Sequence, residues 1–194
     1  MSQDDATELY NDVLHFAIDA HKGMVRKLDH IPFILHPMEV ATIAATMTND
    51  IDVLSAAMLH DVVEDTPHTL SDIEERFGPR IASLVDVETE DKMKDVPPEQ
   101  SWRARKEESL ARLAKAGREE KILWLSDKLA NMRSFYRAYR ERGELLWEDF
   151  HMRDAAQQAW YYVTVAELCS ELRNEAAWQE FSQLIHVVFE GVLS

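Results

Sequence analysis

The residues best suited to chemistry form a short cluster, His60-Asp61 followed by Glu64-Asp65, within the segment AMLHDVVEDT. Four positions separate His60 from Glu64 and Asp61 from Asp65, so on a helix each pair would lie on one face. Burying ionisable groups costs several kcal/mol each unless they are paired or bind a metal ion. The alternative is a solvated helix end that carries incidental charges. Because the apolar run LSAAML leads directly into the cluster, we interpret it as the edge of a pocket.

A metal ion held by His60 and Asp61 needs further ligands, and two residues elsewhere in the chain are candidates. His36 lies in FILHP, an apolar run ended by Pro37, which predicts a ring directed inward at a helix start; a core histidine bonded to backbone is the alternative. Asp127 interrupts ILWLSDKLANM, and a lone carboxylate among core residues is either held by a partner or is a ligand. Two imidazoles and two carboxylates suit a divalent transition metal such as Mn, Fe or Zn, with open positions for water and a phosphate oxygen.

Helical spacing dominates the segments that must position these residues. Apolar residues recur every three or four positions, and no strand-like alternation occurs. Ser71 and Glu74 form a capping-box pattern at one helix start. The polar segment 86–100, which contains Pro97-Pro98, is typical of a mobile loop. We expect helices at about 5–21, 37–45, 52–64, 71–78, 81–85, 101–116, 119–140, 145–172 and 175–190. This pattern predicts an all-α orthogonal helical bundle.

Length and composition indicate one globular domain. The 194 residues are 46% hydrophobic and 29% charged, which excludes a disordered chain. Low counts of glycine (5) and proline (6) favour long helices over a β-sandwich. We therefore expect a single domain over 1–194, with the metal site in about 16–135 and the helices of 145–190 completing the bundle.

Charge and cysteine content restrict the partners and the compartment. The net charge of −15 repels nucleic acid phosphates and anionic membranes, so neither is expected as a partner. The single cysteine, Cys169, excludes an intrachain disulfide and a cysteine-based zinc site. The N-terminus MSQDDATELY has no apolar signal core, and no stretch approaches the roughly 20 apolar residues of a membrane span. We expect a soluble, cytoplasmic protein.

Two basic clusters stand out in this acidic chain, HKGMVRK and WRARK. Arg103, Arg105 and Lys106 of WRARK fit a solvated helix face and a phosphate contact equally well. Trp102 lies beside them, and Tyr161 and Tyr162 lie further along the chain. These aromatic residues could stack on a base, but their helical spacing favours the core.

Five segments in order resemble a known family. The sequences AHKGMVRK, FILHP, MLHDVVEDT, ERFGPRIASLV and LSDKLANMR are similar to the hydrolase domain of RelA/SpoT-type alarmone enzymes, which are HD phosphohydrolases with the pattern H…HD…D. The resemblance runs from about Phe16 to Arg133, with a weaker helical match to about Leu172. Because no synthetase or regulatory domain follows in this sequence, the chain resembles a stand-alone small alarmone hydrolase.

The resemblance implies an HD-type helical bundle and metal-dependent removal of the 3′-pyrophosphate of ppGpp or pppGpp, the alarmones of the stringent response, to give GDP or GTP. It implies Mn²⁺ as cofactor, with Fe or Zn as alternatives, and a small nucleotide as the partner; it leaves the oligomeric state open. By this resemblance the site residues are His36, His60, Asp61 and Asp127 as metal ligands, Glu64 and Asp65 as the catalytic acidic pair, and Arg26, Lys27, Asn131 and Arg153 as substrate contacts.

The sequence also departs from the family, and other functions stay open. Lys128 stands where the family usually has Arg, and VDVETEDK replaces the usual valine-threonine motif. One alternative is an HD phosphohydrolase of another nucleotide, such as a pyrophosphorylated adenine nucleotide or NADPH. Another is a non-catalytic sensor that binds alarmone. The intact pair Glu64-Asp65 argues against a sensor, which has no need of a water-activating pair beside a metal.

Overall fold

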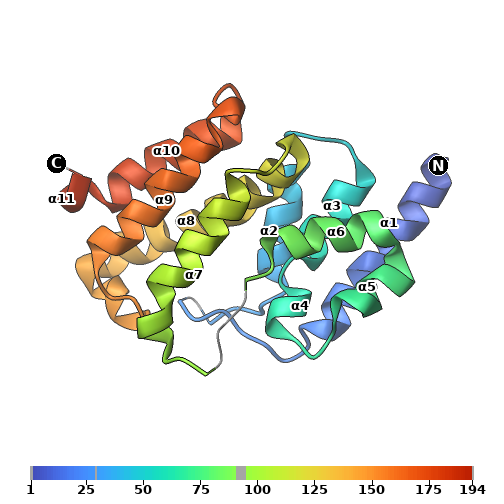
Figure 1. Ribbon diagram of the computed structural model, residues 1–194, viewed down its shortest axis with the longest axis horizontal. Helices are drawn as coiled ribbons and strands as arrows, with labels where there is room; N and C mark the ends of the chain where they lie inside the picture. The colour runs from blue at the N-terminus through green and yellow to red at the C-terminus, as the bar shows by residue number, and fades with distance from the viewer. Residues whose placement is uncertain (1, 29, 91–94, 194) are drawn as a thin grey trace.

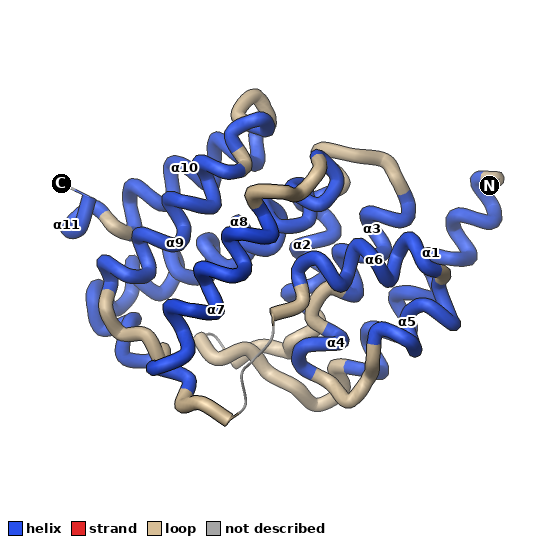
Figure 2. Tube along the Cα trace, viewed as in Figure 1, coloured by secondary structure: helices blue, strands red, loops and turns tan. Residues whose placement is uncertain are grey.

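The computed structural model describes residues 2–28, 30–90 and 95–193, and within these ranges the chain forms helices and loops without a β-strand (Figures 1 and 2). The all-α prediction is therefore confirmed. The helices are α1 (Gln3–Ala20), α2 (Leu35–Ala44), α3 (Ile51–Leu59), α4 (Val62–Asp65), α5 (Leu70–Phe77), α6 (Pro79–Glu88), α7 (Pro98–Leu113), α8 (Arg118–Arg142), η1 (Gly143–Asp149), α9 (Ala155–Leu168), η2 (Ser170–Leu172), α10 (Ala176–Val188) and α11 (Glu190–Leu193). Among the described residues, no helix has the length and apolar character needed to cross a bilayer.

The helices fall into two groups around α8. Figure 1 shows α1 to α6 on one side, α7, α9 and α10 on the other, and the two termini at opposite ends of the long axis. The 25-residue helix α8 contacts both groups, packing against α2 and α3 and against α9 and α10. A ligand on α8 can therefore meet ligands from the N-terminal helices.

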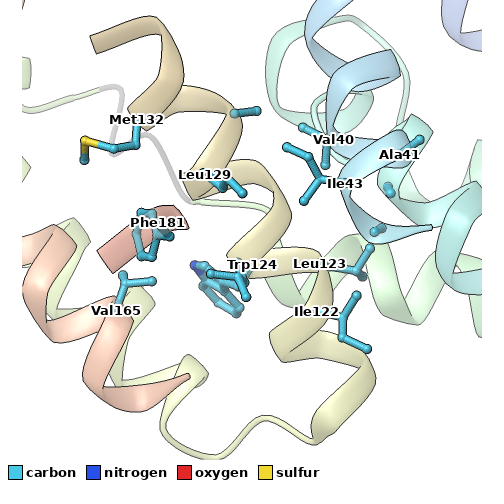
Figure 3. Packing of buried hydrophobic residues seen from close by; sticks show 14 of the residues in the cluster. Val40, Ala41, Ile43, Ile122, Leu123, Trp124, Leu129, Met132, Val165 and Phe181 are labelled. Carbon is cyan, nitrogen blue, oxygen red and sulfur yellow. The ribbon is translucent and has the colours of Figure 1, made fainter. Parts of the chain in front are cut away.

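Apolar residues on both faces of α8 hold it in this central position. Figure 3 shows Val40 and Ile43 of α2 on one side of the helix and Phe181 of α10 on the other. Trp124 and Leu129 of α8 are fully buried in the same core. Full burial of a large apolar side chain contributes about 1.5–3 kcal/mol, so these contacts fix α8 firmly against both groups.

The expected single helix over 52–64 is wrong, because the structure breaks it at His60-Asp61. Helix α3 ends at Leu59, and α4 begins at Val62 after a turn. Adjacent side chains of a continuous helix point about 100° apart. At the turn His60 and Asp61 keep right-handed helical backbone angles, and His60 Nε2 lies 3.1 Å from Asp61 Oδ2.

Other helix boundaries also differ from expectation. The capping box of α5 is formed by Thr69 and Asp72 rather than by Ser71 and Glu74. Thr69 has the extended backbone that an N-cap requires, and its side chain accepts a hydrogen bond from the Asp72 amide. Gly78, which follows α5, has φ +92° and ψ 163°, a conformation that glycine adopts without strain.

The expected loop over 86–100 is shorter at both ends. Helix α6 continues to Glu88, and α7 already begins at Pro98, where the missing proline amide costs no hydrogen bond. Within this segment, residues 91–94 lie outside the described part of the chain. The expected helix over 145–172 is replaced by η1, α9 and η2. The new start of α9 is fixed by Asp154, whose Oδ1 accepts a hydrogen bond from the Ala156 amide at 2.8 Å.

Candidate metal centre and active site

The structure brings the four expected metal ligands together from three parts of the fold. His36 lies in the first turn of α2, His60 and Asp61 form the turn after α3, and Asp127 lies in α8. His36 Nε2 is 3.0 Å from Asp127 Oδ1 and 3.4 Å from Asp61 Oδ2. His60 Nε2 is 3.1 Å from Asp61 Oδ2 and 3.7 Å from Asp127 Oδ1. His36, His60 and Asp127 each offer a ligand atom within 4.8 Å of the others, and Asp61 Oδ2 lies beside both ring nitrogens.

The orientation of the His60 ring fits a metal ligand. Its Nδ1 is 2.8 Å from the carbonyl oxygen of Ala57, so donation there leaves Nε2 as the free ring nitrogen. This Nε2 is buried and is aligned for a hydrogen bond with no group among the described residues. A buried nitrogen without such a bond, beside His36 and Asp127, has the surroundings of a ligand atom. The donor set therefore fits a divalent metal ion.

The electrostatics of the cluster also favour a bound cation. Burial acts to lower the pKa of His60, but the carboxylates of Asp61, Asp127 and Glu88 outweigh it and raise the pKa to about 10. Burial raises the pKa of Asp61, whereas the neighbouring His60 and His36 lower it overall. The carboxylates that would hold a proton on His60 can equally stabilise a divalent ion at this position.

Two further polar side chains of α8 bind the carboxylate of Asp127. Asn131 Nδ2 donates to Asp127 Oδ1 at 2.7 Å, and the ammonium group of Lys128 pairs with Asp127 Oδ2. Lys128 Nζ also lies 3.4 Å from Glu88 Oε1. Burial raises the pKa of Glu88 to about 7 even though Lys128 opposes this rise. The sequence predicts no role for Glu88 or Lys128; the one signal is that both stand where the sequence departs from the family pattern.

The metal centre opens into a cavity of about 600 Å³. Glu64 and Asp65 of α4 line this cavity together with Asp61 and Asp127, so the expected acidic pair shares one space with two of the expected ligands. Glu64 is half-buried and Asp65 is exposed. The two carboxylates therefore differ in solvation although they are adjacent in sequence.

The expected substrate contacts are distributed unevenly. Arg26 and Lys27 line the cavity, and Arg26 Nη2 donates to Asn131 Oδ1 at 2.8 Å. This bond links Arg26 to the metal centre, because Asn131 also holds Asp127. Arg153 is exposed and is not part of the cavity wall.

The cations of the basic segment WRARK do not all face the cavity. Arg105 and Lys106 line the cavity, whereas Arg103 stacks on the Trp160 ring at 3.2 Å from its centroid and is not part of the wall. The aromatic side chains of the sequence analysis, Trp102, Tyr161 and Tyr162, are buried as expected, and they also line the cavity.

Comparisons with known proteins agree with this geometry. A family model described as HD domain matches residues 14–152. The chain is 35% identical over 127 residues to the Drosophila melanogaster guanosine-3′,5′-bis(diphosphate) 3′-pyrophosphohydrolase MESH1, covering 64% of this chain and 68% of that protein. It is 49% identical over 79 residues to the bifunctional (p)ppGpp synthase/hydrolase SpoT of Escherichia coli, covering 40% of this chain. That match spans only 11% of SpoT, so the chain corresponds to a small part of this relative.

Solved structures show the same fold over nearly the whole chain. One, described as a metazoan ortholog of SpoT that hydrolyses ppGpp and plays a role in starvation responses, has a TM-score of 0.73 at 26% identity and covers 92% of this chain and 94% of its own. Another, from Listeria monocytogenes, has a TM-score of 0.68 at 30% identity and covers 80% of this chain and 94% of its own. The resemblance seen in the sequence is confirmed, and the chain belongs to the HD domain family.

Proposed function

We propose that the protein is a metal-dependent hydrolase that removes the 3′-pyrophosphate of ppGpp or pppGpp. The observation that carries the proposal is the cluster of His60 with His36, Asp61 and Asp127, of which the last three line the same cavity as Glu64. The names of the relatives support the substrate, because MESH1 is called a guanosine-3′,5′-bis(diphosphate) 3′-pyrophosphohydrolase.

The two histidines and two aspartates would hold the metal, for which Mn²⁺ is our choice and Fe or Zn the alternatives. When bound, the ion supplies Lewis acidity, which lowers the pKa of water and neutralises phosphate charge. The rest of the site consists of the chain's own polar groups around this centre.

Glu64 and Asp65 are the groups that would move protons. In the reaction, the oxygen of water joins the 3′-attached phosphorus, the bond from this phosphorus to the 3′-oxygen breaks, and a proton reaches the departing oxygen. One carboxylate can orient water and accept its proton, and a carboxyl group can return a proton to the 3′-oxygen. Arg26, which Asn131 holds toward the metal centre, can bind a phosphate oxygen of the substrate.

The test is turnover of a nucleotide panel by purified protein with Mn²⁺. We expect pyrophosphate and GDP from ppGpp, and no comparable release from NADPH or a pyrophosphorylated adenine nucleotide. His36→Ala should lose both bound metal and turnover, because it removes a nitrogen 3.0 Å from Asp127 Oδ1. Binding of ppGpp without release of pyrophosphate, or faster release of phosphate from NADPH, would overturn the proposal.

A further inference from the structure

Glu90 is an acidic side chain that lies among cations in the wall of the cavity. Its Oε1 pairs with the guanidinium of Arg105, and its Oε2 accepts from Lys106 Nζ at 2.7 Å and from Ser109 Oγ at 3.3 Å. All three donors come from α7, and all three residues line the cavity with Glu90. The Glu90 side chain is only 9% exposed.

These three donors form a group that suits a phosphate. A guanidinium offers several N–H donors in a planar fork, an ammonium adds a point charge, and a hydroxyl adds a neutral donor. Charge-assisted bonds of this kind are the strong ones in phosphate recognition. The two oxygens of Glu90 now use the donors that a phosphate group would need.

The proposed substrate requires a second anion site. It carries phosphate groups at both the 3′ and 5′ positions of the ribose, and the metal centre can act on only one of them. Near the metal centre Lys128 is already paired with Asp127, and Arg26, which Asn131 holds, serves the phosphate at the metal in the proposed function. Arg105 and Lys106 are a further pair of cations in the same cavity, supplied by a different helix.

We propose that Arg105, Lys106 and Ser109 form the subsite for the phosphate groups that are not cleaved, and that the Glu90 carboxylate occupies this subsite until a substrate displaces it. The inference rests on the proposed function for the identity of the substrate. The inference adds that the Glu90 carboxylate competes with the substrate for this subsite. Removing that carboxylate therefore strengthens binding of a nucleotide diphosphate.

The backbone contacts of Glu90 allow its side chain to leave without moving the chain. Arg112 Nη2 donates to the carbonyl oxygen of Thr89 at 2.6 Å. The Glu90 amide donates to Glu64 Oε2 at 3.4 Å. Both contacts hold the backbone, so rotation about the side-chain bonds of Glu90 is sufficient to free the cations. A diphosphate brings more negative charge than the carboxylate it replaces, which favours the exchange.

A competitor of this kind weakens binding in proportion to its occupancy. The apparent dissociation constant is the intrinsic constant divided by the fraction of protein with a free subsite. If Glu90 occupies the subsite in about nine-tenths of the molecules, its removal strengthens binding by about tenfold.

The experiment measures GDP binding by titration calorimetry to the full chain with its metal retained. GDP carries the 5′-diphosphate without a 3′-group, so the measurement does not depend on turnover. Glu90→Gln should lower the dissociation constant of GDP by about threefold to tenfold. The double variant with Arg105 and Lys106 replaced by Met should raise the dissociation constant of GDP by about tenfold or more, because it loses charge-assisted hydrogen bonds to the diphosphate.

Glu107→Gln is the matched control. Glu107 lies on the same helix and pairs with Arg103 at 2.8 Å, but it is exposed and is not part of the cavity wall. Glu107→Gln removes one negative charge, as Glu90→Gln does, but outside the cavity, so we expect no change in GDP binding. Guanosine, which lacks phosphate, should bind Glu90→Gln and the unchanged protein equally.

The proposal is overturned if Glu90→Gln leaves GDP binding unchanged or weakens it, because Glu90 would then only brace α7. It is also overturned if guanosine gains as much as GDP, which would indicate a wider cavity, or if the double variant binds GDP normally. Glu90→Asp keeps the charge with a shorter side chain and provides a second variant should Glu90→Gln fail to fold; we expect a smaller gain. Absence of ppGpp hydrolysis with these GDP results intact would reject the proposed function alone.

Discussion

Replacing Lys128 by Met removes the ammonium group that pairs with Asp127 and lies 3.4 Å from Glu88 in the wall of the cavity. The Lys128 side chain is 13% exposed, and those of the two carboxylates are 7% and 5% exposed. Removing one partner of a buried ion pair typically costs about 3–5 kcal/mol, because the remaining charge stays buried. Glu88 limits this cost: burial already raises its pKa to about 7, so it can take up a proton near neutral pH. We therefore expect metal-depleted Lys128→Met to lose about 3 kcal/mol of unfolding free energy.

Metal should reduce this loss, because a divalent ion also compensates the charge of Asp127. Lys128 repels a bound cation, so the variant should bind Mn²⁺ more tightly than the unchanged protein. A ligand at 100 times its dissociation constant stabilises the folded state by about 2.7 kcal/mol, and tighter binding adds to this. The stability difference between variant and unchanged protein should therefore become smaller as Mn²⁺ is added.

The assay is urea unfolding followed by circular dichroism, with chelator and at several fixed Mn²⁺ concentrations. Lys121→Met is the matched control, since Lys121 lies on the same helix with the same 13% side-chain exposure. Its partner Glu171 is 43% exposed, and such a pair contributes roughly 0–1 kcal/mol. Equal losses in the two variants, or a Lys128→Met deficit that Mn²⁺ does not reduce, would refute the reasoning.

Three further predictions concern the same cavity. The pKa of Glu88 rises from 4.5 to about 7 on folding, so its contribution to stability is full below pH 4.5 and is lost as the pH rises through 7. Unfolding measured from pH 4 to 8 should therefore show that Glu88→Gln gains stability relative to the unchanged protein as the pH rises. Glu64→Gln and Asp65→Asn should each lower kcat by roughly 100-fold, the scale of a lost proton-transfer group, with metal content by elemental analysis unchanged; loss of metal would instead make the residue a ligand. Asn131→Ala removes the 2.8 Å acceptor of Arg26 and should raise KM for ppGpp several-fold in steady-state assays, and an unchanged KM would contradict the substrate role of that contact.

Some boundaries could be predicted from the sequence because their signals are local. Gly117, which precedes α8, and the apolar period of α8 itself place its ends near the expected 119–140, against Arg118–Arg142 in the structure. The break at His60-Asp61 had no such signal, because the apolar period runs through α3 without proline or glycine. It lies where both side chains meet His36 and Asp127, which are distant in sequence.

The capping of α5 shows a related limit. Thr69-x-x-Asp72 and Ser71-x-x-Glu74 are both capping-box patterns two residues apart, and local sequence does not decide between them. In the structure Ile73 and Phe77 are buried, and packing of this face sets the register of the helix. Tertiary contacts thus selected one of two locally acceptable starts.

The sequence by itself determined the helical class, through its apolar periodicity, and the residue types that a metal centre needs, through the spacing of His36, His60-Asp61 and Asp127. Only the tertiary structure decided how side chains from distant elements pair. Lys128 meets Glu88 across 40 positions, Arg26 meets Asn131 across 105, and Glu90 takes its place among the cations of α7. Such pairs depend on the angles at which helices pack, and these angles follow from the whole core rather than from any local pattern. The packing of α7 also decides which of its faces meets the cavity: Arg105 and Lys106 line it, whereas Arg103, on the same helix, does not.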